Sequence, residues 1–319
     1  MAVAAAMFTS SMANAQVPPR FYWKTLQGTN AVPVIAMSVS GNVNPLDPSQ
    51  HFDPSASLNA DIAIAGFAKM FPVWNKAAML AVLVPMGRIE GDFLAGPLLT
   101  RQSSSGFGDP MVEFNMNLIG PPPIMNLPDM LRYEPGFSLD LVVDVMFPLG
   151  QYDNTQSLNL GQNRWYGRIG TPIVWQLGPW IPDKRTTLEI FPSVYMFGDN
   201  DDFVGQNLHS DLTFALEAHL TRNFTSKFWA SFDASYSSSG DTTITSTTAS
   251  TTTSGSDMTQ VGFTLGYQLS DSLGLTIGYK STLNNDAGSN EPRLSTFNIS
   301  LVTGWHRLLE GASRLSGGG

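Results

Sequence analysis

Residues 210–236 read SDLTFALEAHLTRNFTSKFWASFDASY, and the alternation within this stretch decides the fold. Before the turn at residues 223–226, large or small hydrophobic side chains occupy every second position, while Asp211, Glu217 and His219 fall on the opposite face. After the turn, aromatic and small side chains alternate with polar ones in the same way. A period of two is typical of a β-strand, because successive side chains point to opposite faces of a sheet. The stretch therefore predicts a β-hairpin.

The same alternation recurs along the chain. In residues 137–147, hydrophobic side chains take every odd position, and Asp140 and Asp144 lie on the other face. Twelve segments are expected to be strands: residues 32–40, 58–70, 78–87, 108–118, 137–147, 164–177, 187–197, 210–222, 227–236, 260–267, 273–279 and 297–305. A strand of ~10 residues rises ~33 Å, and a tilt of about 40° projects this to roughly the 25 Å apolar band of an outer-membrane barrel. We therefore predict an all-β chain that forms a transmembrane, antiparallel up-and-down β-barrel of about twelve strands.

The composition fits a chain that faces lipid. Charged residues make up 13% of the 319 residues, about half of the roughly 25% found in soluble domains, while hydrophobic residues make up 42%. The longest apolar run, residues 77–86, is too short for a membrane-spanning helix, which needs about 20 residues. The absence of cysteine excludes disulfides and thiolate metal sites. A net charge of -9 argues against a nucleic-acid partner.

The connections between the predicted strands alternate in length. Short ones are expected at residues 71–76, 178–185, 223–226 and 270–271, and long ones at residues 41–57, 88–105, 149–163, 198–209, 237–257 and 284–292. Bacterial outer-membrane barrels have short periplasmic turns and long external loops. We therefore predict that the short turns and both termini are periplasmic. Aromatic rings near this rim fit the membrane interface: Trp74, Trp180, Phe224, Tyr267 and Trp305.

Two connections carry expectations of their own. The one at residues 119–135 is long for a periplasmic turn and is expected to contain a short helix. Residues 237–256 are dominated by Ser and Thr, a composition that predicts a mobile, solvated external loop. An adhesive or ligand-binding role for this loop is the alternative.

The N-terminus predicts export. Residues 2–12 are small and apolar, and the Ala-Asn-Ala at residues 13–15 matches the small-X-small cleavage pattern of a secretory signal peptide. Residues 1–15 are therefore expected to be a signal peptide. We expect it to be truncated at its start, because the first basic residue is Arg20.

The rest of the chain divides into three parts. Residues 16–31 include the run RFYWK at residues 20–24 and are expected either to plug the lumen or to lie at the periplasmic rim. Residues 32–305 form the predicted barrel, and residues 306–319 form a C-terminal tail. Either Trp305 serves as the terminal aromatic that helps barrel assembly, or the tail is an appendage.

The polar face of the predicted strands supplies candidate lumen residues. These are Glu113, Asp140, Asp144, Arg168, Glu189, Asp211, Glu217, His219, Asp233 and Lys280, with Asn115 and Asn117 beside them. Charges inside a barrel must be paired or hydrated. We expect Arg168 to form a cross-strand network with the acids nearest to it, Asp140, Asp144 and Glu189. The network is either a polar constriction that selects solutes or structural filling of the interior.

Residues that suggest catalysis or metal binding are weaker candidates. His209 and Ser210 invite a hydrolase hypothesis, but adjacent residues on a strand point to opposite faces, so the base is not aimed at the nucleophile. His219 has no serine on its own strand face. The acidic run at residues 199–202 lacks EF-hand spacing, and Ca²⁺ binding there is the alternative to a solvated loop. We therefore predict no enzyme, no catalytic residue, no cofactor and no metal site.

Three motifs lie where strands are expected to pass into loops. Their residues are Gly106, Gly108, Asp109 and Pro110, then Pro148, Gly150, Tyr152 and Asp153, then Asn159, Gly161, Asn163 and Trp165. Glycine gives the backbone freedom, proline stops ladder pairing, and asparagine hydrogen-bonds loop backbone. The motifs are therefore expected to shape the external mouth of the barrel.

With these motifs the chain resembles the outer-membrane transporter family labelled "putative MetA-pathway of phenol degradation" over most of residues 32–305. The resemblance implies a channel in the bacterial outer membrane for small hydrophobic or aromatic solutes of the phenol type. It does not imply an enzyme. A non-transporting surface barrel whose loops bind a partner is the class alternative. Expected partners are outer-membrane lipid, the solute and the barrel-assembly machinery.

Overall fold

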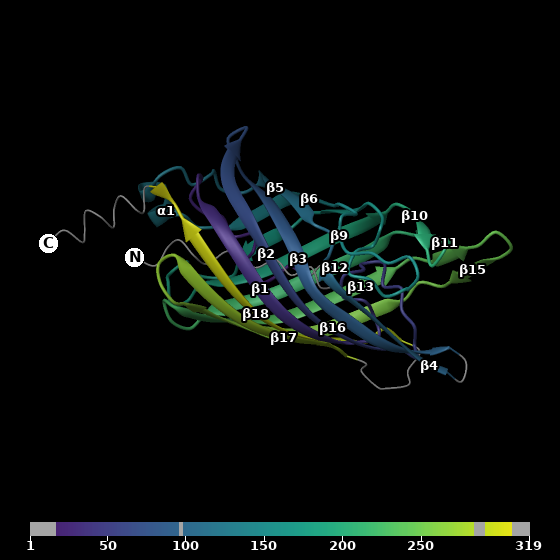
Figure 1. The fold of residues 1–319 in the computed structure, drawn as a ribbon. Coiled ribbons are helices and arrows are strands. Elements are labelled where there is room, and N and C mark those ends of the chain that lie inside the picture. The colour runs from purple at the N-terminus through teal and green to yellow at the C-terminus, as the bar shows by residue number, and fades with distance from the viewer. Residues whose placement is uncertain (1–16, 96–97, 284–290, 308–319) are drawn as a thin grey trace.

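A computed structural model describes residues 17–95, 98–283 and 291–307, and they form a closed β-barrel (Figure 1). The predicted signal peptide, residues 1–15, lies outside the described residues, as do residues 308–319 of the predicted tail. The wall consists of β1 (Asn30–Gly41), β2 (Ser57–Val73), β3 (Lys76–Ala95), β5 (Met111–Ile119), β6 (Phe137–Met146), β7 (Tyr166–Gly170) continued by β8 (Ile173–Gln176), β9 (Thr186–Phe197), β12 (Thr213–Asn223), β13 (Phe228–Ser239), β16 (Asp257–Gln268), β17 (Leu273–Thr282) and β18 (Leu294–Trp305). Neighbours pair antiparallel in chain order, and β18 pairs with β1 to close the ring. The prediction of an antiparallel barrel of about twelve strands is confirmed.

One strand of the wall is interrupted at a proline. β7 ends at Gly170 and β8 begins at Ile173, with Pro172 between them. Proline has no backbone N–H to donate to a ladder, but the Pro172 carbonyl still accepts a hydrogen bond from the Asp140 amide at 2.9 Å. The two pieces therefore continue as one strand between β6 and β9.

The barrel wall has a polar inner face and an apolar outer face. On β12, Thr213, Glu217 and His219 are buried, whereas Phe214 and Leu220 point outward with 40% and 47% of their surface exposed. The outward positions of the other strands carry exposed hydrophobic side chains as well. A continuous apolar band of this kind is suited to contact with lipid. Among the described residues, no helix is long and apolar enough to cross a membrane.

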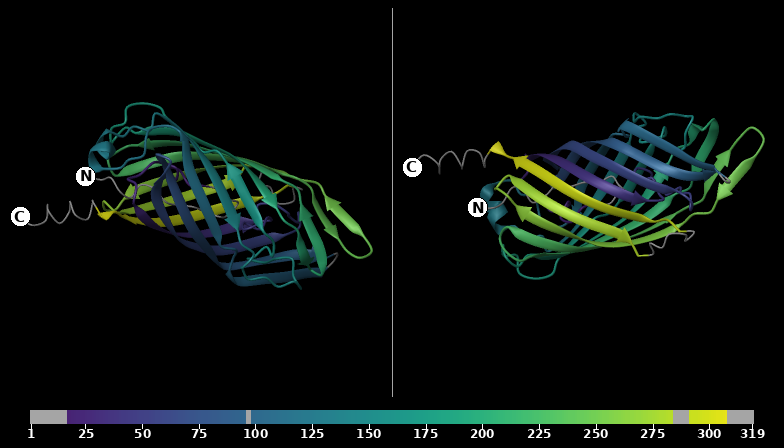
Figure 2. Two further views of the ribbon diagram at one scale, coloured as in Figure 1. Left: turned by 90° about the horizontal axis from the view of Figure 1, so that it is seen from above. Right: turned by 60° about the horizontal axis from the view of Figure 1, so that its bottom comes forward.

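The short turns and the two ends of the barrel sequence share one end of the molecule (Figures 1 and 2). Asn30 of β1 pairs with Trp305 of β18 there. Trp74 in the tight turn between β2 and β3 is 85% exposed at the same end. We call this end of the barrel the terminal end and the opposite one the loop end.

The long connection between β5 and β6 contains helix α1 (Leu127–Arg132). The Asn126 side chain caps its first turn by accepting a hydrogen bond from the Asp129 amide at 2.9 Å. The short helix expected within residues 119–135 is therefore confirmed. It lies at the terminal end, near the entry of the chain into the barrel (Figure 1).

Three connections that we expected to be long loops contain strands instead. They are residues 88–105, 198–209 and 237–257. The first continues β3 into a hairpin with β4 (Leu98–Phe107). The other two supply a four-stranded sheet at the loop end, made of β10 (Asn200–Phe203), β11 (Gln206–Ser210), β14 (Thr242–Thr245) and β15 (Ser250–Thr253).

Residues 237–256 contain strands where we expected a loop, for a local chemical reason, while residues 247–255 are exposed as expected of a solvated segment. Thr is β-branched and favours extended backbone, although it is polar. The Thr243 and Thr252 hydroxyls lie 3.0 Å apart across the β14–β15 pair, and β14 pairs with β11. Our prediction used only the polarity of the Ser and Thr side chains and did not consider the preference of Thr for strands.

Candidate functional site in the lumen

The lumen contains the stretch that precedes β1, residues 17–29, here called the N-terminal segment. Its aromatic side chains are buried against the inner wall. Tyr22 meets Phe191 edge-on with ring centroids 5.3 Å apart, and Trp23 lies 4.9 Å from Trp180. The segment thus occupies the interior near the terminal end of the barrel.

Two glutamates of the wall bind the backbone of the N-terminal segment. The Val17 amide donates to Glu217 on β12 at 2.6 Å. Glu189 on β9 accepts from the Arg20 amide at 2.7 Å and from the Trp23 indole N–H at 2.8 Å. Buried carboxylates are stable only when such donors replace water. Two of the predicted lumen acids, Glu189 and Glu217, therefore hold the N-terminal segment in place.

A third acid, Asp140 on β6, forms a buried ion pair with Lys24 of the N-terminal segment. The same carboxylate accepts hydrogen bonds from Asn117 at 2.8 Å and from Ser138 at 3.3 Å. These partners orient Asp140 within the wall. The ion pair therefore links a fixed carboxylate to a chain that enters from the terminal end.

Arg168 on β7 lies among three other acids. Its guanidinium forms an ion pair with Asp144 and lies 3.8 Å from a carboxylate oxygen of Glu113 and of Glu217. The antiparallel register puts Arg168 directly opposite Asp144. The cross-strand network thus includes the expected partner Asp144. Glu113 and Glu217 take the places expected for Asp140 and Glu189, which hold the N-terminal segment.

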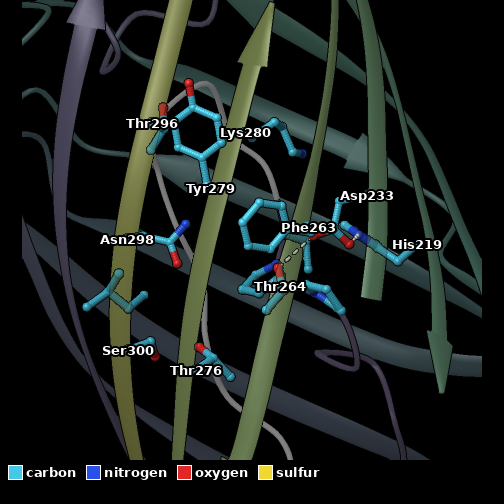
Figure 3. Close-up of a pocket in the computed structure, with 14 residues that line it drawn as sticks. His219, Asp233, Phe263, Thr264, Thr276, Tyr279, Lys280, Thr296, Asn298 and Ser300 are labelled. Atoms are coloured by element: carbon cyan, nitrogen blue, oxygen red, sulfur yellow. Dashed lines mark hydrogen bonds and ion pairs between the residues drawn. The ribbon is translucent and has the colours of Figure 1, made fainter. Parts of the chain in front are cut away.

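His219 and Asp233 form a pair on β12 and β13 (Figure 3). The His219 Nδ1 atom lies 2.8 Å from Asp233, which also accepts hydrogen bonds from Ser231 at 2.5 Å and Thr264 at 2.6 Å. Lys280 on β17 lines the same cavity. These three predicted lumen residues are therefore gathered on one side of the interior.

Asp211 was predicted to face the lumen, and this prediction is wrong. Its side chain is 61% exposed, since β12 begins only two residues later. It lies 3.5 Å from the His209 Nε2 atom. The neighbouring Ser210 is buried and accepts a hydrogen bond from Arg164 at 2.9 Å. Ser210 and His209 thus have separate partners and do not form a nucleophile–base pair.

A cavity of about 40 Å³ remains between the start of the N-terminal segment and the wall on the side of β16, β17 and β18 (Figure 3). Uncharged polar side chains line most of this side: Thr264, Thr276, Thr296, Asn298 and Ser300. For comparison, a cavity of about 150 Å³ is needed to hold benzene. This cavity therefore has room for water but not for an aromatic solute.

The predicted motif residues build the loop end. Asp109 accepts hydrogen bonds from the Gly150 amide at 2.9 Å and the Gln162 amide at 2.7 Å. A Cβ on Gly161 would lie 2.8 Å from the Gly150 carbonyl carbon, so these two backbones touch. The carboxylate and the paired glycines join the three motifs into one structure.

The asparagines and aromatic rings of the motifs make the remaining contacts. Asn159 accepts from the Asp153 amide at 2.9 Å. Asn200 donates to the Tyr152 hydroxyl and accepts from Asn163, both at 2.9 Å. The other motif residues flank these contacts. Pro110 accepts from the Phe147 amide at 2.9 Å, Pro148 follows that residue, and Trp165 lies 4.9 Å from the Phe147 ring. Gly106 lies near the end of β4, and Gly108 lies between β4 and β5.

Sequence reasoning missed Arg164, Asp47 and His51, which lie beside these motifs. Arg164 is buried and forms an ion pair with Asp47 at 3.1 Å. Both belong to connections, where no alternation separates inward from outward side chains. The available signal was the charge of Arg164 inside an otherwise uncharged motif.

Comparisons with known proteins agree with this geometry. A family described as "Putative MetA-pathway of phenol degradation" matches residues 27–301. The COG4313 outer membrane channel from Pseudomonas putida F1 is similar in fold, with a TM-score of 0.70 at 18% identity, covering 91% of this chain and 100% of that chain. Two weaker likenesses are the transport unit of the autotransporter AIDA-I from Escherichia coli (TM-score 0.48, 8% identity, 92% and 95% covered) and the NanC porin (0.45, 11%, 85% and 98%). Among curated protein sequences, none matches this chain significantly.

Proposed function

We propose that this chain, which belongs to the family described as "Putative MetA-pathway of phenol degradation", forms a bacterial outer-membrane channel for small uncharged solutes of the phenol type. One observation carries the proposal. The N-terminal segment lies in the lumen, and the cavity beside its start is lined mainly by hydroxyl and amide side chains, with His219, Asp233 and Lys280 as the charged or titratable groups. In this proposal the segment is a plug that moves to let a solute pass.

The terminal end faces the periplasm in this proposal. Short turns gather there, as they do on the periplasmic side of outer-membrane barrels. Aromatic rings such as Phe67 and Trp305, 6.2 Å apart, mark its outer rim. Membrane lipid covers the apolar outer face. Residues 1–15 act as the signal peptide, and the barrel-assembly machinery inserts the barrel.

The plug has to move for a solute to pass, because the cavity beside it is smaller than an aromatic ring requires. The residual cavity of about 40 Å³ is far below the roughly 150 Å³ that benzene occupies in a protein. The plug is held by side-chain contacts and by few main-chain bonds, such as Gly28 to Met70 at 2.9 Å. The plug can therefore detach from the inner wall without breaking the pairing between strands of the barrel.

The lining favours uncharged solutes. Desolvating a charge inside a narrow lumen is costly unless a fixed opposite charge receives it. Most charges of the wall are engaged with each other or with the plug, as Asp144 with Arg168 and Asp140 with Lys24. The side of β16–β18 offers hydroxyls and an amide, and Lys280 is its one charged side chain in the cavity lining. A small molecule with one hydrogen-bonding group suits this path.

A surface barrel that binds a partner and transports nothing is the second candidate. The four-stranded sheet at the loop end supports it, because β15 is exposed along its whole length. We propose no enzymatic activity for either candidate.

Uptake of phenol tests the channel directly. Proteoliposomes with the full chain should take up phenol faster than liposomes without protein, and cells that lack the gene should take up phenolic compounds more slowly while fatty acids and sugars enter unchanged. Deleting residues 17–29 should raise the permeability of the barrel to all small solutes. A folded barrel that admits no phenol in either form would exclude the channel and favour the surface role.

A further inference from the structure

A second cavity, of about 160 Å³, lies at the loop end and is separate from the lumen site. We call it the mouth cavity. Four parts of the chain form it: the connection at residues 42–56, the ends of β2 and β3, the motif loop at residues 152–162, and the β10–β11 hairpin. Its walls are both aromatic and polar. It is therefore a built pocket and not a gap between loops.

Most polar groups of the mouth cavity already have partners within the protein. Asn44 donates to the Asn159 carbonyl at 2.9 Å, and Asn200 bonds the Tyr152 hydroxyl at 2.9 Å. These bonds fix the walls. Only polar groups without a partner inside the protein remain free to bind a solute.

Two polar atoms in the mouth cavity have no hydrogen-bond partner among the described residues. They are the Nδ1 atom of His51 and the Nε2 atom of Gln162, and both atoms are buried. Gln162 as a whole is 9% exposed. A buried polar atom without a partner is costly, so both atoms favour a ligand that forms a hydrogen bond with them.

His51 is uncharged at neutral pH, because burial lowers the pKa of its imidazole below the ordinary value. A neutral imidazole has one ring nitrogen that accepts a hydrogen bond. The amide nitrogen of Gln162 donates. With the proton of the imidazole on Nε2, Nδ1 of His51 is the acceptor, and the two unpartnered atoms then suit a group that both accepts and donates, as a hydroxyl does.

The volume and the aromatic lining of the mouth cavity indicate which kind of molecule bears that hydroxyl. A cavity of about 150 Å³ holds one benzene ring, and the mouth cavity is of this size. Phe52, Phe93 and Phe203 supply aromatic walls. Asp53 lies in the same lining and disfavours an anion, whereas the charge of Asp47 is already paired with Arg164.

We propose that the mouth cavity binds an uncharged monocyclic phenol, with the ring among the three phenylalanines and the hydroxyl bonded to Gln162 and His51. The inference rests on the proposed function, since it names the solute class that the barrel captures at its loop end. It adds a binding site distinct from the lumen.

The test measures binding apart from transport. The full chain in lipid nanodiscs is titrated with 4-fluorophenol and with 4-fluorotoluene, which lacks the hydroxyl, and binding is followed by fluorine NMR against empty nanodiscs. Gln162→Met keeps the side-chain length and removes the donor, and it should weaken 4-fluorophenol about tenfold. The affinity for 4-fluorotoluene should not change. 4-Fluorobenzoate, an anion, should bind neither protein.

A matched control and a second variant keep the test decisive. Gln151→Met makes the same change at an exposed position of the same loop and should leave binding unchanged. His51→Leu removes the other recognition atom and should also weaken 4-fluorophenol selectively. Unchanged 4-fluorophenol affinity in both folded variants would overturn the proposal. If the protein binds 4-fluorophenol but proteoliposomes take up no phenol, the channel proposal is wrong and the binding site stands. If proteoliposomes take up phenol but the variants bind 4-fluorophenol as the wild type does, the binding site is wrong and the channel stands.

Discussion

Lys24 of the N-terminal segment forms a buried ion pair with Asp140, which lies 116 residues later on the inner face of β6. Both residues are buried, so each charge depends on the other. The pair joins the part of the chain that we propose to move to the wall that stays fixed.

Removing one partner of this pair should release the plug. Lys24→Met leaves the Asp140 carboxylate buried without its cation, and breaking a buried pair in this way costs about 3–5 kcal/mol. The chain has no cysteine, so Thr25→Cys supplies a unique label. Maleimide should modify this cysteine at least tenfold faster when Lys24→Met is present, as measured by mass spectrometry.

The double variant and a surface pair give the controls. Adding Asp140→Asn removes the stranded charge and should slow labelling again. Arg88 and Glu90 form an exposed pair at 3.0 Å, and breaking an exposed pair costs about 1 kcal/mol or less. Arg88→Met should therefore leave labelling unchanged. Equal labelling with and without Lys24 would show that the ion pair does not hold the plug.

Stability of the loop end should depend on pH through Asp109. Burial raises the pKa of this carboxyl from 3.8 to about 6, with the backbone N–H donors of Gln162 and Gly150 opposing the shift. The folded state therefore favours the protonated acid. This contribution is fully present below about pH 4 and is lost as the pH rises through 6, with a loss of about 3 kcal/mol.

Hydrogen exchange measures this effect locally. The amides of Gly150 and Gln162 should be more protected near pH 4 than near pH 7, after correction for the intrinsic pH dependence of exchange. Asp109→Asn cannot ionise, so its protection should not change over this range, although it is lower throughout because one acceptor oxygen is lost. A wild-type protein with the same profile as Asp109→Asn would contradict the assignment.

Arg168 should matter more for stability than any other cation of the wall. Arg168→Met leaves three buried carboxylates close together, and we expect it to lower the free energy of unfolding by about 3–5 kcal/mol. Denaturation by urea in bicelles measures this. Adding Asp144→Asn should restore part of the loss. Arg222 lies on the exposed face with a 3.0 Å bond to Thr186, and Arg222→Met should have little effect.

The wall of the barrel could be predicted from the sequence because its rule is local. Each strand must place lipid-facing side chains at alternate positions, so residues 137–147 alone predict β6 (Phe137–Met146) closely. The four-stranded sheet at the loop end has no lipid face. Its pairing of β11 with β14 joins residues about 35 positions apart, and polar side chains on both faces leave no period to detect.

The candidate site divides in the same way. Alternation predicted which charges point inward, and nearly all of the predicted lumen residues are buried. Their partners depend on register between strands and on the path of the plug. Asp144 could be expected beside Arg168, but Lys24 could not be assigned to Asp140, nor Glu113 and Glu217 to Arg168, without that geometry. Arg164 and His51 lie in connections, where periodicity carries no information.

The contact between Gly161 and Gly150 should be essential to the loop end. A Cβ on Gly161 would lie 2.8 Å from the Gly150 carbonyl carbon, and backbone cannot give way as a flexible side chain would. Gly161→Ala should therefore destabilise the motif loop by about 1–3 kcal/mol and expose residues 148–163 to protease. A Cβ on Gly178 would meet no atom of the described residues within 4 Å, so Gly178→Ala is the matched control and should be cleaved like the wild type. Because the mouth cavity is lined from the same loop, Gly161→Ala should also lose binding of 4-fluorophenol while the barrel stays folded. Equal protease resistance of the two variants would show that the close approach of the two backbones is not required.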